Sequence, residues 1–253
     1  MNAPSPPPTL PFSDPPSPET AGTEAVDFTG GHRDRLRARF LKLGGDGLSD
    51  EELLEMLLFA INPRKDVKPL AKLLLKNFGA LGAVLNAPPE RLRGLKAAGV
   101  ALSTDNAVAV VRLAGALGVR MLQREMMKET VLSSWDAVVN YCSAAMADEP
   151  VEQFRVIFLN RRNAVIADEL QQRGTVDHTP VYPREIMRRA IELGATALVL
   201  AHNHPSGDPT PSRADIEMTK EIVRAAQAVG VTVHDHLVIG KGRHVSFKSK
   251  GLM

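Results

Sequence analysis

The chain has 253 residues, of which 44% are hydrophobic and 24% are charged, with a formal net charge of +2 at neutral pH. This is an ordinary globular composition, and the length allows one large or two small domains. The single cysteine, Cys142, excludes an internal disulfide and a cysteine-rich zinc site. It favours a soluble protein of a reducing compartment, so we expect a cytoplasmic location.

The N-terminal segment is unlike the rest of the chain. Residues 1–25 contain eight prolines before Glu19, three acidic residues and no basic residue. The segment has too few large apolar residues to offset the entropy cost of ordering, so we predict a disordered proline-rich tail. It lacks the basic and apolar regions of a signal peptide. The best apolar run, residues 195–201, is far shorter than the roughly 20 residues of a membrane-spanning helix, so we expect no membrane partner.

Residues 26–127 have the apolar spacing of helices, with no alternating pattern of strands. Helices are predicted at residues 34–43, 67–77 and 103–120. Another follows Ser49, since Ser49 and Glu52 form a capping-box pattern before an apolar run. We therefore predict a small helical bundle. Residues 26–125 contain 16 Lys and Arg against 11 Asp and Glu, which gives a mild attraction for polyanions, although a solvated helical surface would give the same count.

Within this part, residues 92–119 have the outline of a helix-hairpin-helix. In such motifs the backbone N–H groups of the turn and of the next helix approach a nucleic-acid phosphate. The usual Gly-hydrophobic-Gly turn is altered here, because Ala101 follows Gly99 and Val100 in place of the second glycine, and Asp105 would repel phosphate. The hairpin is therefore predicted, while DNA contact through residues 91–112 stays an open alternative. Any such contact would be independent of DNA sequence and sensitive to salt.

Residues 128–253 change to a mixed pattern of strands and helices. The predicted elements are a helix at 134–147, strands at 154–159 and 164–168 joined by a hairpin at 160–163, a helix at 183–193, a strand at 195–201, a helix at 212–229 and a strand at 231–239. This order predicts an α/β or α+β domain in which a sheet lies between helices.

Two histidines and an aspartate in this domain have the spacing of a metal site. His202 and His204 lie at the end of a buried strand, and their i, i+2 spacing places both rings on one face. After a proline-rich loop, Ser212 is a strong N-cap, and Asp215 falls in the first turn of the next helix. Two imidazole nitrogens and one carboxylate oxygen suit Zn²⁺ and leave one position for a reactive water. The alternative is that Ser212 and Asp215 only cap the helix.

The motif His202-x-His204, seven residues, then Ser212-x-x-Asp215 resembles that of the JAMM (MPN-type) zinc metalloproteases. The wider sequence resembles the RadC family, on the runs GHRDRLRARF, GLSDEELLEMLLF and PREIMRRAIELGATALVLAHNHPSGDPTPSRAD. The resemblance covers nearly everything from residue 31 to residue 247. It implies an MPN-type sheet wrapped by helices, preceded by a helical domain with a helix-hairpin-helix.

The resemblance also implies roles for residues at the site. His202, His204 and Asp215 would bind one zinc ion per chain, and Ser212 would hydrogen-bond the forming oxyanion or the bound water. The general base would be Glu152, just before the strand at 154–159. Its rivals are Glu149 and Glu185, and Glu152 could instead be a solvated residue of an acidic stretch. These roles imply hydrolysis of an amide or isopeptide bond in a protein or peptide substrate.

Two other residues are given no part in the metal site. His236 belongs to a second His-x-His pair, with His234, but no Ser-x-x-Asp follows it. We expect His236 to orient a ligand or support the sheet rather than bind metal. Cys142 lies in an apolar helical context without a neighbouring base, which predicts a packed, inert thiol.

Two functions compete with a zinc hydrolase. One is a protein of DNA metabolism, a DNA-binding module or a metal-dependent nuclease, which the basic residues of the helical part and the proposed repair role of the RadC family support. The other is a metal-free scaffold that retains only the fold. The complete ligand set places the hydrolase first and the scaffold last.

Overall fold

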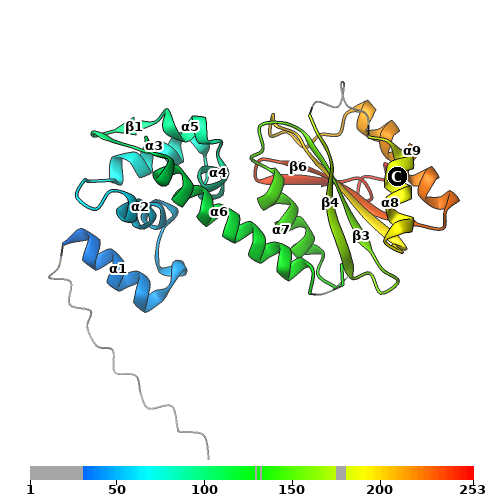
Figure 1. The fold of residues 1–253 in the computed structure, drawn as a ribbon, viewed down its shortest axis with the longest axis horizontal. Helices are drawn as coiled ribbons and strands as arrows, with labels where there is room; N and C mark the ends of the chain where they lie inside the picture. Colours follow the sequence, from blue (N-terminus) through cyan, green and yellow to red (C-terminus); the bar gives the residue numbers. More distant parts are fainter. Residues whose placement is uncertain (1–30, 129, 132, 175–180) are drawn as a thin grey trace, which may run out of the picture.

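A computed structural model describes residues 31–128, 130–131, 133–174 and 181–253. The predicted tail at residues 1–25 lies outside these ranges. The described chain forms two parts, a helical N-terminal part and a sheet-containing C-terminal part, which lie side by side and are joined by one long helix, α6 (Figure 1). Within the described ranges, no helix combines the length and the apolar character needed to cross a membrane.

The N-terminal part is a small helical bundle around its own apolar core, as predicted. Its elements are α1 (His32–Leu43), the 3₁₀ turn η1 (Gly45–Gly47), α2 (Asp50–Ile61), α3 (Lys68–Phe78), α4 (Leu81–Asn86), α5 (Pro89–Arg93), β1 (Lys96–Ala97), β2 (Val100–Ala101) and α6 (Asp105–Met126). The predicted capping box is present, because Ser49 accepts from the backbone N–H of Glu52 and the Glu52 carboxylate accepts from that of Ser49.

The turn between α5 and α6 is a two-stranded antiparallel hairpin formed by β1 and β2. The expectation that this part holds no strand was wrong for these residues. Ala98 and Gly99, at the tip, have φ values of +48° and +75°. Glycine adopts such values without the steric cost that a β-carbon adds. The Lys65 ammonium donates to the Gly99 carbonyl over 3.0 Å. This helix, hairpin and helix match the predicted outline.

Helix α6 belongs to both parts of the protein. It was predicted to end at residue 120 but continues to Met126. Val108 and Val111 near its start are buried in the N-terminal core, whereas Met126 is buried in a second core beneath the sheet, with Leu122 packed against it. Apolar contacts at both ends therefore keep the chain helical past the predicted end.

The C-terminal part is a five-stranded mixed sheet with helices on both faces, which confirms the predicted α/β (α+β) class. Its elements are α7 (Trp135–Met146), β3 (Gln153–Leu159), β4 (Val165–Arg173), α8 (Pro183–Glu192), β5 (Ala197–Asn203), α9 (Arg213–Ala228), β6 (Thr232–Gly240) and β7 (Arg243–Ser246). The strand order is β4-β3-β5-β6-β7, and β5 and β6 are the parallel neighbours. Strand β7 was not predicted, and β4 continues to Arg173 rather than ending at residue 168.

The two faces of the sheet are buried by different helices. In β5, Val199 and Ala201 belong to the core that contains α7, whereas Leu198 and Leu200 belong to the core that contains α8 and α9. Figure 1 shows α7 on one side of the sheet and α8 and α9 on the other. Burial on both faces explains the continuous apolar run at residues 195–201.

Candidate metal centre

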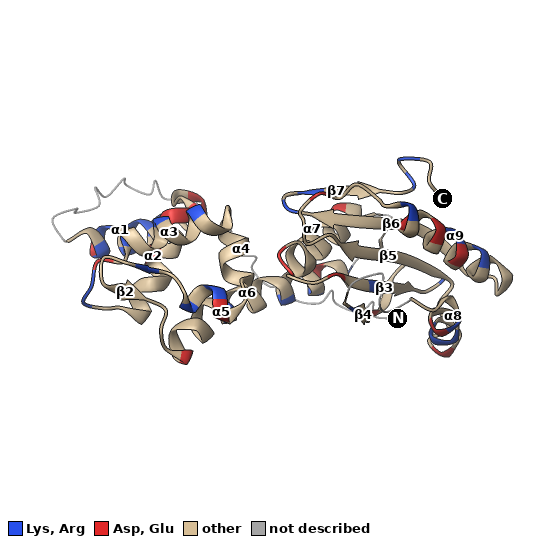
Figure 2. Ribbon diagram, turned by 90° about the horizontal axis from the view of Figure 1, so that it is seen from above, with Lys and Arg blue, Asp and Glu red and all other residues tan. Residues whose placement is uncertain are grey.

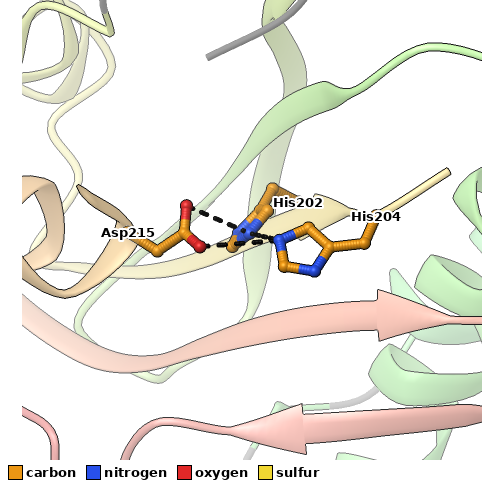
Figure 3. Close-up of side chains that lie close together, drawn as sticks. All are labelled: His202, His204 and Asp215. Carbon is orange, nitrogen blue, oxygen red and sulfur yellow. Dashed lines mark hydrogen bonds and ion pairs between the residues drawn. The ribbon is translucent and has the colours of Figure 1, made fainter. Parts of the chain in front are cut away.

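The fold brings His202, His204 and Asp215 together at the end of β5 (Figure 3). Because side chains alternate along a strand, His202 points to the same face as Leu200, the face covered by α9. His204 follows directly after β5, and its backbone N–H donates to the Ile239 carbonyl of β6 over 2.9 Å, which keeps it aligned with the sheet. Asp215 lies in the first turn of α9.

The start of α9 orients the carboxylate of Asp215. The Ser212 hydroxyl accepts from the backbone N–H of Asp215 over 3.1 Å, and Oδ2 of Asp215 accepts from the backbone N–H of Ser212 over 2.7 Å. This capping box satisfies two helix N–H groups that have no partner within the helix. The other oxygen, Oδ1, lies 3.4 Å from Nε2 of His202. Capping therefore leaves a carboxylate oxygen directed at the histidines, so capping and metal binding are compatible.

The distances between the candidate ligand atoms are close to those around a tetrahedral zinc ion. Nε2 of His202 and Nε2 of His204 are 3.0 Å apart, Nε2 of His202 lies 3.4 Å from Oδ1 of Asp215, and Nε2 of His204 lies 3.5 Å from Oδ2. Ligand atoms about 2.0–2.1 Å from a tetrahedral ion lie ~3.3–3.4 Å from one another. The three side chains are therefore close enough together to bind one such ion.

The ring of His204 presents a bare nitrogen to this space. Its Nδ1 lies 2.7 Å from the Asp208 carbonyl, which only accepts, so Nδ1 carries the proton and Nε2 of the neutral ring is a lone pair. That lone pair faces the second imidazole at 3.0 Å. The neighbouring carboxylate of Asp215 raises the pKa of His204. Such a nitrogen, beside a carboxylate, requires either a proton or a metal ion, and the donor set fits zinc.

The carboxyl of Asp215 is held ionised in this setting. Its side chain is 2% exposed, and burial alone would raise its pKa, but the contacts with His202 and His204 and the hydrogen bond from Ser212 outweigh burial and hold the pKa well below its usual range. A deprotonated oxygen is the form that binds a cation. The two histidines and this aspartate thus offer two neutral nitrogens and one anionic oxygen.

Comparison with known proteins agrees with the fold and the motif. Residues 132–252 match the family model described as a RadC-like JAB domain. The chain is also 55% identical over 218 residues to a UPF0758 protein of Rhodobacter capsulatus, an alignment that covers 86% of this chain and 100% of the relative. The chain belongs to the RadC family. The resemblance drawn from the motifs is therefore confirmed at the level of family and of the JAB-type C-terminal domain.

Of the three glutamates considered as a base in this RadC-family protein, Glu152 is the one that lines a pocket with His202 and Asp215. Its charge also contributes to raising the pKa of His204, although less than the contact with the Asp215 carboxylate, which is the largest cause. The other two glutamates considered as the base form ion pairs elsewhere. Glu149 pairs with Arg173 at 3.3 Å, and Glu185 forms ion pairs with arginines of its own helix, α8.

The other residues considered in the sequence lie at or near the site or in the core. Ser212 is exposed at the start of α9, where its oxygen serves the cap. His236 lies behind His202, with its Nε2 2.7 Å from Nδ1 of His202, and burial lowers its pKa well below the ordinary value. Cys142 is fully buried in α7, and burial raises its pKa to about 12, as expected for an inert thiol.

Two groups around the RadC site escaped prediction. The carbonyl of Asp208 orients His204, but a backbone carbonyl has no signature in a sequence. The hydroxyl of Thr219 contacts His236. A signal for Thr219 existed, because it lies four residues after Asp215 and therefore one helical turn further along the same face of α9.

Proposed function

We propose that this RadC-family protein is a zinc-dependent hydrolase that cleaves an amide or isopeptide bond in a protein or peptide. The observation that supports the proposal most strongly is the convergence of His202, His204 and Asp215, whose nearest nitrogen and oxygen atoms lie 3.0–3.5 Å apart. A pocket bordered by Glu152 adjoins these ligands. A carboxylate beside a three-ligand metal site is the arrangement that metal-assisted hydrolysis requires.

The chain's own residues have separate tasks in this proposal. Bound zinc supplies a Lewis acid and lowers the pKa of a water molecule at its open position. Glu152 takes a proton at its carboxylate and transfers it to the leaving amine. The Ser212 oxygen accepts from the Asp215 N–H, which leaves its O–H hydrogen able to donate to the oxygen on which negative charge develops. Phe154 and Met218 line the same pocket and limit the access of bulk water.

Metal content gives the first test. Wild-type protein, purified without chelators, is expected to hold about one zinc per chain, since three ligands with an open position describe a catalytic site. The double variant His202→Ala/His204→Ala should hold almost none. The scaffold alternative predicts that neither protein binds zinc, and that substitution of Asp215 changes stability alone. Wild-type protein with only a trace of tightly bound zinc would overturn the hydrolase.

Activity of Glu152→Gln gives the second test. Wild type and variant are compared on peptide, isopeptide-linked and DNA substrates with added zinc. The variant should keep its zinc and lose about 10²–10⁴-fold in rate, because the amide retains the shape of the side chain but cannot accept the proton. Glu149→Gln is the matched control, since Glu149 precedes the same strand but pairs with Arg173. Equal rates for wild type and Glu152→Gln would exclude Glu152 as the base.

DNA binding is the second candidate function, favoured by the hairpin between α5 and α6. Arg91 and Lys96 are exposed beside this hairpin. Arg93, however, pairs with Asp105 at 2.5 Å, which neutralises one basic group at the start of α6. Figure 2 shows acidic segments interleaved with the basic ones in this part of the protein. The proposed contact is therefore weak and made only to the phosphate backbone.

Fluorescence anisotropy with branched and linear DNA tests this second function. Binding at low ionic strength should weaken steeply as salt is added, and Lys96→Ala should reduce the salt dependence by about one phosphate contact. Lys220→Ala is the control, because Lys220 lies on α9 in the other part of the protein. Undetectable binding at low ionic strength, or binding that does not depend on salt, would exclude DNA contact through residues 91–112.

A further inference from the structure

Behind His202, a chain of buried hydrogen bonds runs from β5 through β6 to α9. Nδ1 of His202 lies 2.7 Å from Nε2 of His236, and Nδ1 of His236 lies 2.6 Å from Oγ1 of Thr219. The Thr219 hydroxyl is also 2.6 Å from the backbone carbonyl of Asp215, one turn earlier in α9. His236 and Thr219 are both completely buried. The chain therefore connects two of the three candidate ligands through side chains that solvent does not reach.

The hydrogens of this chain can be assigned from its far end. The Asp215 carbonyl can only accept, so the single hydroxyl hydrogen of Thr219 is donated to it. Oγ1 of Thr219 must then accept from Nδ1–H of His236. In the neutral ring of His236, a proton on Nδ1 leaves Nε2 as a lone pair, which accepts from Nδ1–H of His202. Nε2 of His202 is left without a proton and faces His204 and Asp215.

We infer that Thr219 and His236 are positioning residues of the metal site, which hold His202 in the tautomer that leaves Nε2 free for the ion. The inference rests on the proposed zinc site. The partner of the second ring nitrogen generally decides which nitrogen of a ligating histidine is free, and losing that partner weakens metal binding. Here the partner is a neutral imidazole, and its own tautomer is set by a threonine on a different element.

Packing holds the intermediate ring in the required orientation. Phe247 stacks on His236 with ring centroids 4.6 Å apart, and Phe154 meets the edge of the same ring at 5.5 Å. A ring held on two sides cannot turn to present its other nitrogen without displacing these aromatic groups. The same hydroxyl also fixes the turn of α9 that carries Asp215. One threonine therefore sets the protonation of one ligand and the position of another.

Zinc affinity of Thr219→Val tests the inference. Valine has the shape of threonine without the hydroxyl, so His236 loses the acceptor that fixes its tautomer. Zinc affinity, measured by competition with a chromophoric chelator, should fall about 10–100-fold. Thr219→Ser retains the hydroxyl and should stay close to wild type. Ser246→Ala is a control for loss of a partly buried hydrogen bond, since Ser246 donates to Asp235 next to His236, and its zinc affinity should not change.

The tautomer itself can be read in wild-type protein without metal. Nitrogen NMR of histidine-labelled protein, at a pH above the ordinary histidine pKa, should show His236 protonated at Nδ1 and His202 protonated at Nδ1. Protonation of His236 at Nε2, or equal zinc affinity for Thr219→Val and wild type, would overturn the inference. If Thr219→Val does not fold, the NMR assignment decides. If wild type binds no zinc, the proposed function fails, while the metal-free NMR measurement still tests the tautomers.

Discussion

Replacing Asp215 by asparagine separates metal binding from helix capping at one residue. The amide oxygen of asparagine can accept from the backbone N–H of Ser212, as Oδ2 of the carboxylate does over 2.7 Å. The amide nitrogen would then replace Oδ1, which lies 3.4 Å from Nε2 of His202. A donor in this place can bond to the bare imidazole nitrogen but cannot bind a cation. Asp215→Asn should therefore keep the start of α9 and lose the metal site.

The expected effect is a loss of stabilisation by zinc. A ligand at 1,000 times its dissociation constant adds about 4 kcal/mol to the free energy of unfolding. Changing groups that only support a metal ligand already costs about 10–100-fold in affinity, so losing one of the three ligands should cost at least ~100-fold. At the same zinc concentration the added stability then falls to about 1.4 kcal/mol.

Urea unfolding followed by circular dichroism measures this difference. Each protein is unfolded with zinc and with excess chelator, and the zinc-dependent increase in unfolding free energy is compared between wild type and Asp215→Asn. Ser212→Ala is the matched control, because it removes half of the cap but no ligand. Equal zinc-dependent increases for wild type and Asp215→Asn would refute the assignment of Asp215 as a ligand, whatever the stability of the metal-free proteins.

Other substitutions test the surroundings of the site. A β-carbon at Gly240 would lie 2.4 Å from the Gly207 carbonyl oxygen, so Gly240→Ala should displace the loop before α9. The substitution should lower the unfolding free energy by about 1–3 kcal/mol and reduce zinc content. An unchanged urea midpoint would contradict this prediction. Asp168→Ala leaves the half-buried Arg155 without its partner at 2.8 Å and should cost about 3–5 kcal/mol in the same assay. Because burial raises the pKa of Cys142 to about 12, its contribution to stability is complete below its ordinary pKa and is lost as pH rises toward that value. The fall in unfolding free energy with alkaline pH should therefore be smaller in Cys142→Ala, and equal falls would contradict the shifted pKa.

The convergence of His202, His204 and Asp215 could be predicted because its signals are local. The i, i+2 spacing of His202 and His204 fixes a common face on any strand, and Ser212 and Asp215 carry the pattern of a helix start. A sequence pattern could not supply the contact of Thr219 with His236, since it depends on how α9 crosses β6. The spacing from Asp215 places Thr219 on the same face of α9, but it does not show which residue Thr219 contacts.

The boundaries of helices and strands also divide into those set by neighbouring residues, which could be predicted, and those set by tertiary packing, which could not. The capping box before α2 and the hairpin at residues 160–163 were predicted correctly, since both depend on neighbouring residues. The predicted end of α6 failed because contacts with a distant core extend the helix to Met126. Strand β7 is short and has two exposed residues, Arg243 and His244, so no alternation of apolar residues marks it.

Because α6 packs into both cores, the point at which the C-terminal part is cut out for transfer into another protein matters. The family match begins at residue 132, yet Val119, Leu122 and Met126, all upstream of that point, pack into the core on the α7 side of the sheet. A fragment excised at the family boundary would leave a gap where Met126 is buried and would expose the apolar side of α7. A fragment that keeps this core complete would therefore include the last two turns of α6.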